Sequence, residues 1–194
     1  MPVYTISAYP KTLTLPDGQE VVLRPMVQQD AQALLDFFLR IPEEDRFYLK
    51  EDVTSPSVIQ RWAQDLDYDR ALPLLAVVDG RIVADGTLHR RRAGARRHVG
   101  ELRVVVDPRY RGRGIGTAIL KELILIARDR GLDRLVFELV EGVQERAIQT
   151  ASSLGFVRLA SLPGHVRDIG GRPHDLVIME LLLGKWQEWW ETET

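Results

Sequence analysis

The 194-residue sequence contains no cysteine, which excludes disulfides, thiolate metal sites, iron–sulfur clusters and a cysteine nucleophile. Long hydrophobic runs are also missing: those at residues 74–78 and 181–183 are far shorter than the roughly 18 residues that cross a bilayer. The first residues show neither the charged nor the apolar region of a signal peptide. We therefore expect a cytoplasmic protein that does not enter a membrane.

An excess of charge of one sign is missing as well. Lys and Arg number 26 against 28 Asp and Glu, so the net charge of −2 gives no field that attracts nucleic acid or anionic lipid. The length is that of about one domain. We expect a single domain over residues 1–194, with a core at about 20–183, an N-terminal strand extension at 1–19 and a Trp-rich tail at 184–194.

Hydrophobic periodicity and turn residues predict a mixed α/β order. Asp79-Gly80 is a strong hairpin signal, Ser55-Pro56 is a helix start, and residues 43–53 read as a polar loop. The tryptophans of residues 185–191 have helical spacing. Strands are predicted at 11–15, 20–24, 72–78, 81–89, 99–106, 135–140, 156–162 and 176–183, and helices at 28–39, from 56, at 114–130 and at 145–154.

One segment of the chain carries a chemical motif. The apolar strand at 99–106 ends at Asp107-Pro108, and a glycine-rich turn then opens the amphipathic helix at 114–130. The start of a helix presents unpaired amides and a positive dipole end. Two interleaved series of alternate positions follow the strand: the arginines Arg109, Arg111 and Arg113, and the glycines Gly112, Gly114 and Gly116. This composition predicts an anion cradle suited to a pyrophosphate.

The spacing of this turn differs from that of a P-loop and from that of a dinucleotide fingerprint. It resembles the R/Q-x-x-G-x-G/A signature of the GNAT superfamily of acyl-CoA-dependent N-acyltransferases, as Arg111-x-x-Gly114-x-Gly116. Ala147 and Leu154-Gly155-Phe156 resemble a later helix and strand entry of that family, and the element order is similar over residues 20–183. The alternative is an ordinary glycine-rich turn with solvated arginines.

The resemblance implies a mixed, mostly antiparallel sheet flanked by helices, with a splayed strand pair that binds acyl-CoA. It implies direct transfer of an acetyl group from acetyl-CoA to a primary amine on a small molecule or a protein. Main-chain groups of Val104, Val105 and Val106 would contact the pantetheine arm. The pyrophosphate would be held by the amides of Arg111, Gly112, Arg113, Gly114, Ile115, Gly116 and Thr117.

Two carboxylates are candidates for the base that deprotonates the amine. Glu101 occupies a strand position where family members often carry such a group, and Glu138 on the neighbouring strand is the second candidate. The alternative for Glu101 is a solvated residue paired with Arg103. Where many members of the family have a thiolate-protonating tyrosine, this chain has Ala151. Ser152, Ser153 or water could take that role, or the protein could be a non-catalytic acyl-CoA-binding or sensing module.

Other polar groups are open to more than one interpretation. The arginine-rich loop at 90–97 reads as a solvated hairpin tip, and the acids of residues 43–52 either attract a cationic amine or form a solvated loop. The tryptophan-rich tail could cover the protein's own core or form a homodimer contact. No metal is expected, because four residues that invite a metal site do not have the spacing of one: His165, Asp168, His174 and Asp175.

Overall fold

The computed structural model describes residues 8–184 and has one mixed sheet of eight strands within that range. The strand order is β1-β2-β3-β4-β5-β6-β8-β7. In chain order the elements are β1 (Lys11–Thr14), β2 (Glu20–Pro25), η2 (Gln28–Asp30), α1 (Ala31–Arg40), α2 (Glu43–Arg46), α3 (Pro56–Gln64), β3 (Ala71–Val78), β4 (Arg81–Arg90), β5 (Val99–Val106), η3 (Pro108–Tyr110), α4 (Ile115–Asp129), β6 (Arg134–Val140), α5 (Glu145–Ser153), β7 (Val157–Arg167) and β8 (Pro173–Leu182).

The chain divides into two compact units. The first comprises residues 8–87 and 104–120, and the second comprises residues 88–103 and 121–184. Three elements, β4, β5 and α4, each begin in one unit and end in the other. The anion-binding turn that the sequence predicts lies in the first unit, whereas Glu101 and Glu138 belong to the second.

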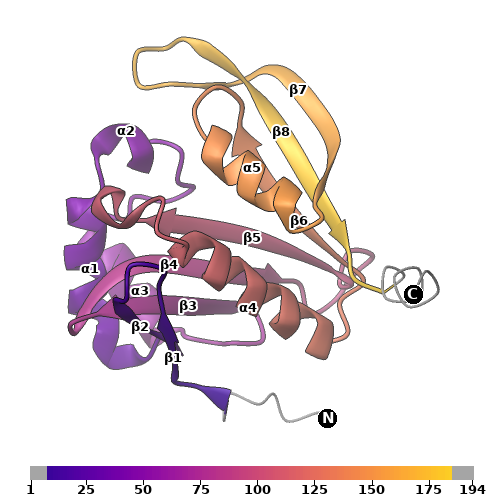
Figure 1. The fold of residues 1–194 in the computed structure, drawn as a ribbon. Coiled ribbons are helices and arrows are strands. Elements are labelled where there is room, and N and C mark those ends of the chain that lie inside the picture. Colours follow the sequence, from indigo (N-terminus) through magenta and orange to yellow (C-terminus); the bar gives the residue numbers. More distant parts are fainter. Residues whose placement is uncertain (1–7, 185–194) are drawn as a thin grey trace. The chain divides into compact units, whose positions relative to one another are not determined.

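The first unit contains a strand meander with two helices packed on it (Figure 1). β1 pairs with β2 and β2 with β3, both antiparallel. α1 and α3 bury the apolar side chains that their helical spacing predicts. The resulting core also receives Leu75, Ile82 and Val105 from the strands, and its fully buried members include Met26, Leu34, Phe37, Phe38, Ile41 and Ile59.

The predicted hairpin between β3 and β4 is confirmed. Asp79 has a φ of 49° and Gly80 a φ of 75°. Positive φ at both central residues is what a type I′ turn requires, and aspartate and glycine are the residues that tolerate it. This two-residue turn sets the register in which β3 pairs with β4.

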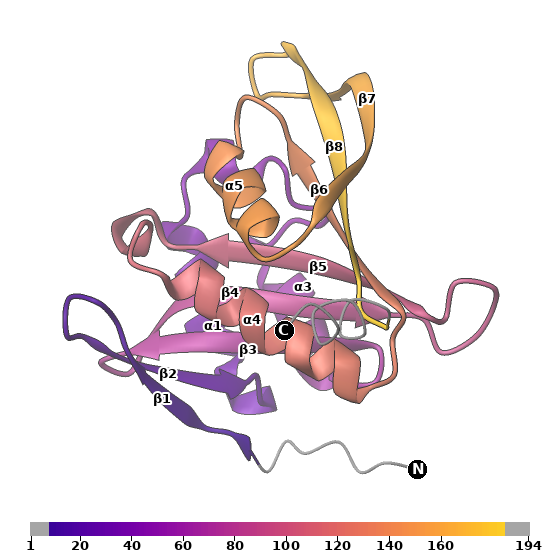
Figure 2. The ribbon, with the colours of Figure 1, turned by 45° about the vertical axis from the view of Figure 1, so that its right-hand side comes forward.

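The second unit contains the parallel pair of the sheet, β5 with β6, and the antiparallel strands β8 and β7 (Figure 2). α5 packs against β6, and the rings of Phe137 and Phe156 meet edge to face with centroids 6.4 Å apart. The parallel register runs from Val99–Arg134 to Leu102–Phe137. Since β5 continues to Val106 and β6 to Val140, both strands extend beyond the last pair of their ladder.

The predicted mixed, mostly antiparallel sheet flanked by helices is confirmed, and most boundaries agree within two residues. Two predictions were wrong. The polar loop at 43–53 begins with the short helix α2, which has no buried side chain and so no apolar pattern to reveal it. The last two strands are longer than predicted, because the side chain of Asp168 accepts from the Arg172 amide at 2.9 Å and closes the turn between them.

The predicted helix at 185–191 and the proposed homodimer contact of the tail lie outside the described residues. Within residues 8–184 no helix is long and apolar enough to cross a membrane.

One buried carboxyl group in β4 makes the stability of the fold depend on pH. Asp85 is buried, and Thr87 Oγ1 donates to its Oδ1 at 3.2 Å. Burial raises the pKa of Asp85 from 3.8 to about 7, although the hydrogen bond from Thr87 opposes the rise. The folded state therefore keeps a proton that the unfolded state releases between about pH 4 and pH 7, and stability from this group is lost as the pH rises through that window.

We predict that Asp85→Asn raises the free energy of unfolding at pH 8 by about 2–4 kcal/mol, because asparagine keeps the shape and cannot ionise. The gain should shrink towards zero near pH 4. Urea denaturation at several pH values measures it, with Asp79→Asn in the adjoining exposed turn as the control for loss of a carboxylate on the same hairpin. A pH-independent difference between Asp85→Asn and the parent protein would contradict the assignment.

Candidate functional site

The turn after β5 is built from a short 3-10 helix and two left-handed glycines. Asp107 caps η3, Pro108 takes its first position, and Arg111 ends it in an extended conformation. Gly112 and Gly114 follow with φ of 72° and 91°, which other residues rarely adopt. The chain therefore reverses within a few residues and enters α4 directly from the strand end.

The first turn of α4 leaves its amides available. The first hydrogen bond of the helix runs from the Ala118 amide to the Gly114 carbonyl at 2.9 Å. Among the described residues, the amides of residues 112–117 donate no hydrogen bond. A Cβ on Gly114 would meet nothing within 4 Å, and one on Gly116 would meet only Val106 Cγ2, at 3.6 Å. Six consecutive amides without a described partner thus lie at a helix start, which is the part of the chain where the sequence predicts an anion cradle.

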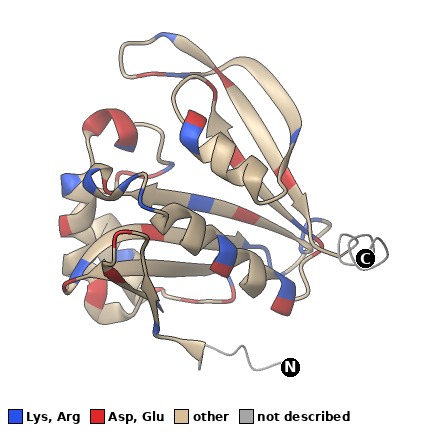
Figure 3. Cartoon of the chain, in the orientation of Figure 1, with Lys and Arg blue, Asp and Glu red and all other residues tan. Residues whose placement is uncertain are grey.

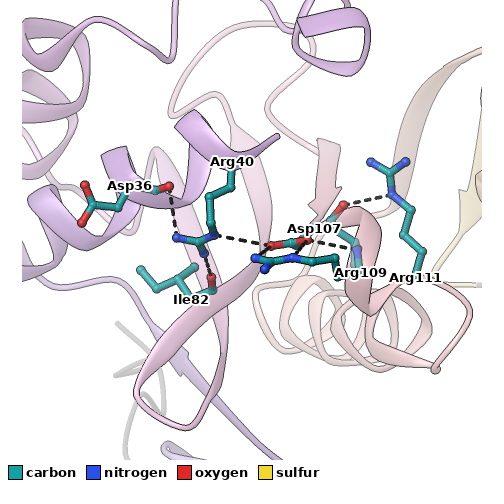
Figure 4. Close-up of polar contacts among 7 residues, drawn as sticks. Asp36, Arg40, Ile82, Asp107, Arg109 and Arg111 are labelled. Carbon is teal, nitrogen blue, oxygen red and sulfur yellow. Dashed lines mark hydrogen bonds and ion pairs between the residues drawn. The ribbon is translucent and has the colours of Figure 1, made fainter. Parts of the chain in front are cut away.

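Asp107 fixes where this cradle begins (Figure 4). Its amide donates to the Val83 carbonyl of β4 at 2.9 Å, and its carboxylate accepts from the Arg109 amide at 3.0 Å and from the Arg109 guanidinium at 3.0 and 3.2 Å. The guanidinium of Arg40, at the end of α1, approaches the same carboxylate at 3.5 Å and donates to the Ile82 carbonyl at 2.6 Å. Asp107 thus joins α1 and the turn through its buried carboxylate, and β4 through its amide.

The protonation of Asp107 follows from these contacts. Its side chain is 2% exposed, and burial alone would raise its pKa. Hydrogen bonds from Arg109 and Arg40 outweigh the burial and hold the pKa below the usual value of 3.8. Asp107 is therefore ionised at neutral pH, when it can hold both guanidinium groups.

The arginines of the turn are themselves paired with carboxylates of the first unit. Arg109 pairs with Asp107, Arg111 Nη2 lies 2.8 Å from Asp45 Oδ2, and Arg113 Nε lies 2.7 Å from Asp17 Oδ2. Arg113 also donates to the Gln19 side chain at 2.6 Å and lies over the Tyr110 ring. The side-chain charge of the turn is thus largely balanced, and the amides and the end of the α4 dipole supply its positive potential.

The two candidate bases share one face of the sheet in the second unit. Glu101 of β5 lies opposite Val136 of β6, and Glu138 is two residues further along β6 on the same face. The Glu101 carboxylate accepts from Arg103 Nη2 at 3.2 Å and from Nε at 3.3 Å. The ion pair named as the alternative for Glu101 is therefore present, and the side chain is still one-third exposed. The structure brings the two glutamates onto one face and leaves the base unassigned between them.

In α5, where the resemblance would place a tyrosine, the serine hydroxyls donate to carbonyls of the helix itself. Ala151 is fully buried in the core. Ser152 donates to the Ile148 carbonyl at 2.9 Å, and Ser153 donates to the Thr150 carbonyl at 2.8 Å. Gln144 accepts from the Val140 amide at 2.8 Å and so closes the loop after β6. Burial explains the presence of Ala151, and hydrogen bonds within this segment explain Gln144, Ser152 and Ser153.

The polar residues at the tip of the β7–β8 hairpin hold the turn. Asp168 Oδ2 lies 3.1 Å from His174 Nε2 and 2.9 Å from Arg172 Nε, and Asp175 accepts from the Gly164 amide at 2.8 Å. Hydrogen bonds from His174 and from Arg172 lower the pKa of Asp168. In the part of the chain that the structure describes, no three His, Cys, Asp or Glu side chains are placed to bind a metal ion.

Sequence reasoning missed Arg40 and the pairing role of Asp45. Arg40 lies 67 residues before Asp107, and no local pattern links the two positions. A signal for Asp107 did exist, because an aspartate directly before a proline at the end of an apolar strand is a typical cap.

Comparison with known proteins gives consistent results. Residues 33–156 match the model of the acetyltransferase (GNAT) family. An acetyltransferase of Pseudomonas aeruginosa is 27% identical over 157 residues, which cover 74% of this chain and 78% of that protein. The L-amino acid N-acyltransferase MnaT of Escherichia coli is 38% identical over 87 residues, 45% of this chain and 49% of that protein.

Solved structures share the fold. A GNAT-family acetyltransferase from Streptococcus pneumoniae superposes with a TM-score of 0.74 at 24% identity, covering 84% of this chain and 99% of that chain. The structure of yncA from Salmonella typhimurium with its cofactor acetyl-CoA superposes with a TM-score of 0.72 at 21% identity, covering 85% and 95%.

We predict that Asp107→Asn lowers the free energy of unfolding by about 1–3 kcal/mol, because the guanidinium groups of Arg40 and Arg109 lose their buried counter-charge. The loss should be largest above pH 5, where the parent carboxylate is ionised in the folded state, and should shrink as the pH falls below about 4. Urea denaturation measures it. Arg109→Gln is the matched control: it removes only the more exposed partner, and its effect should be smaller. Equal effects of the two variants would contradict the central role of Asp107.

Proposed function

The chain belongs to the GNAT family of acetyltransferases, and from this premise we propose that it transfers an acetyl group from acetyl-CoA directly to a primary amine. The observation that carries the proposal is the run of amides at residues 112–117, which donate no hydrogen bond to any other described residue. Phosphate groups are among the anions that such a helix start binds, and the diphosphate of CoA supplies two of them.

The cofactor would bind along the end of β5 and the start of α4. Val104, Val105 and Val106 follow the last β5–β6 pair, Leu102–Phe137, so their main-chain groups lie outside that ladder and can pair with the amides of the pantetheine arm. The amides of residues 112–117 would hold the diphosphate, whereas the Arg111 amide, which the sequence also predicts as a contact, donates to the Pro108 carbonyl at 3.4 Å and is not available for it. The open space beside Gly114 lets a phosphate oxygen approach the main chain closely.

In the reaction, the nitrogen of the neutral amine attacks the thioester carbonyl and forms a tetrahedral oxyanion. The oxyanion collapses to the amide, and the carbon–sulfur bond breaks to release the CoA thiolate. A strand amide aimed at the oxyanion would stabilise the transition state. The amine must lose a proton, and Glu101, directly or through an ordered water, is the proposed base, with Glu138 as second candidate.

The departing thiolate needs no acid from the protein. Ala151 cannot protonate it, and the hydroxyls of Ser152 and Ser153 donate to helix carbonyls. A thiol is acidic enough to leave as the anion: the cysteine thiol, for comparison, has a pKa of about 8.5. We propose that solvent supplies the final proton.

The amine acceptor is proposed only by class. A similar protein carries the name L-amino acid N-acyltransferase, which makes the α-amine of an amino acid one candidate, beside other small amines and the amines of proteins. We place the protein in the cytoplasm, since it must share a compartment with acetyl-CoA. The buried Ala151 supports one rival, a module that binds acyl-CoA without turnover. Steady release of CoA thiol from acetyl-CoA with an amine panel separates the enzyme from the module.

A glutamate in the cradle should abolish cofactor binding. We predict that Gly114→Glu weakens the binding of CoA more than about 100-fold, because a carboxylate would stand where the diphosphate binds. Isothermal titration calorimetry measures the Kd. Gly94→Glu is the matched control, since Gly94 has a φ of 90° and equally open surroundings in the β4–β5 loop. Unchanged affinity in folded Gly114→Glu would overturn the cofactor site.

Loss of the base should slow the chemical step. We predict that Glu101→Gln lowers kcat by about 10²–10⁴ and removes the pH dependence that the base imposes, while the Kd of acetyl-CoA stays within about twofold. Stopped-flow thiol release across pH measures it. Arg103→Gln, which removes the ion-pair partner and keeps the carboxylate, is the control and should keep most of kcat. If Glu138→Gln alone gives the large loss, the base is Glu138.

A further inference from the structure

The helix α2 is held to the first unit by few side-chain contacts. Its four residues bury no side chain, and its main-chain bonds run to Pro42 and Glu43. The Arg46 Nε donates to the Ile41 carbonyl at 2.8 Å, which is a contact within the same segment. The contact that reaches the cradle is the ion pair of Asp45 with Arg111, 66 residues away in the sequence. Three of the four residues of α2 are acidic, and its ribbon is largely red in Figure 3.

Arg111 joins α2 to the end of β5. Its Nε donates to the Val106 carbonyl at 3.0 Å, and its Nη2 donates to Asp45 Oδ2 at 2.8 Å. The Arg111 and Asp45 side chains are 38% and 34% exposed, so water screens the pair and its contribution to stability is small. A weak pair of this kind is easily broken by a stronger anion at the same guanidinium.

We propose that Arg111 is shared between two competing anions, the carboxylate of Asp45 and the diphosphate of the cofactor, so that cofactor binding loosens α2. This inference rests on the proposed function, because it needs the diphosphate at the amides of residues 112–117, which directly follow Arg111. Phosphate groups bind arginine more strongly than an exposed carboxylate does. The Nε bond to Val106 can persist while Nη2 changes partner, so Arg111 stays at the cradle in both states.

The two anions must oppose each other. A diphosphate that arrives beside Arg111 meets the negative charge of Asp45, and like charges that share one guanidinium repel. Coupling of this kind is reciprocal: if Asp45 weakens cofactor binding, cofactor binding weakens the hold of Arg111 on α2 by the same factor. The pantetheine part of the cofactor, which carries no phosphate, should not take part in the coupling.

Calorimetry on the full chain tests this competition. Asp45→Asn should tighten the binding of CoA about two- to fivefold, the size expected for loss of an exposed ion pair, and should leave the affinity for pantetheine unchanged. In the Arg111→Gln background, Asp45→Asn should have no effect on the Kd of CoA. Glutamine is a suitable replacement because the R/Q signature also allows it. Asp36→Asn, on the exposed side of α1, controls for loss of a distant negative charge.

Hydrogen exchange gives a second readout that affinity alone does not. In the parent protein, the amides of residues 43–47 should exchange faster after CoA is added. In Asp45→Asn, the same amides should show this faster exchange even without CoA. An unchanged or weaker Kd in Asp45→Asn, or an equal gain in the Arg111→Gln background, would overturn the proposal. If the parent protein does not bind CoA, the proposed function fails instead, so the two failures are distinguishable.

Discussion

The ionised carboxylate of Asp107 is the interaction on which the predicted cofactor site depends. It lies where β5 ends, it is buried, and it holds two guanidinium groups and the amide of Arg109. Its own amide bonds to β4 at Val83. Because β4, α1 and the turn all contact this one residue, the start of α4 has a fixed position relative to the strand that precedes it. Asp107 itself lies outside the run of amides proposed to contact the cofactor, and its role is to position them.

Around the turn, side chains and main chain have different roles: the charged side chains pair with one another, and the main-chain amides are left for an anion. Carboxylates of the first unit pair with the arginines of the turn, and this pairing offsets the repulsion among the three cations. In the proposed cofactor site the main chain then binds the anion, and this capacity does not depend on side-chain conformation. Arg111 is the exception, because it belongs to both systems. Its exposed pair with Asp45 is weak enough to respond to a ligand, whereas the buried carboxylate of Asp107 is not.

The parts of the fold that could be predicted are those with local patterns. Alternating residues, the Asp79-Gly80 turn and the glycine-rich entry to α4 each determine the backbone around them, and the structure agrees with these predictions. Features that depend on contacts distant in sequence were missed. The pairs Arg40–Asp107, Asp45–Arg111 and Asp17–Arg113 join segments 66 to 96 residues apart. Hydrophobic periodicity carries no information on such pairs. It also could not reveal α2, which has no apolar face, so the sequence pattern predicts a loop there.

The central claim is that the amides after β5 bind the diphosphate of CoA, and backbone amide NMR tests it most directly. The account predicts that CoA shifts the signals of residues 112–117 strongly, and that pantetheine, which has no phosphate, leaves those signals in place while it perturbs residues 104–106. Binding of CoA with the signals of residues 112–117 unmoved would contradict the account.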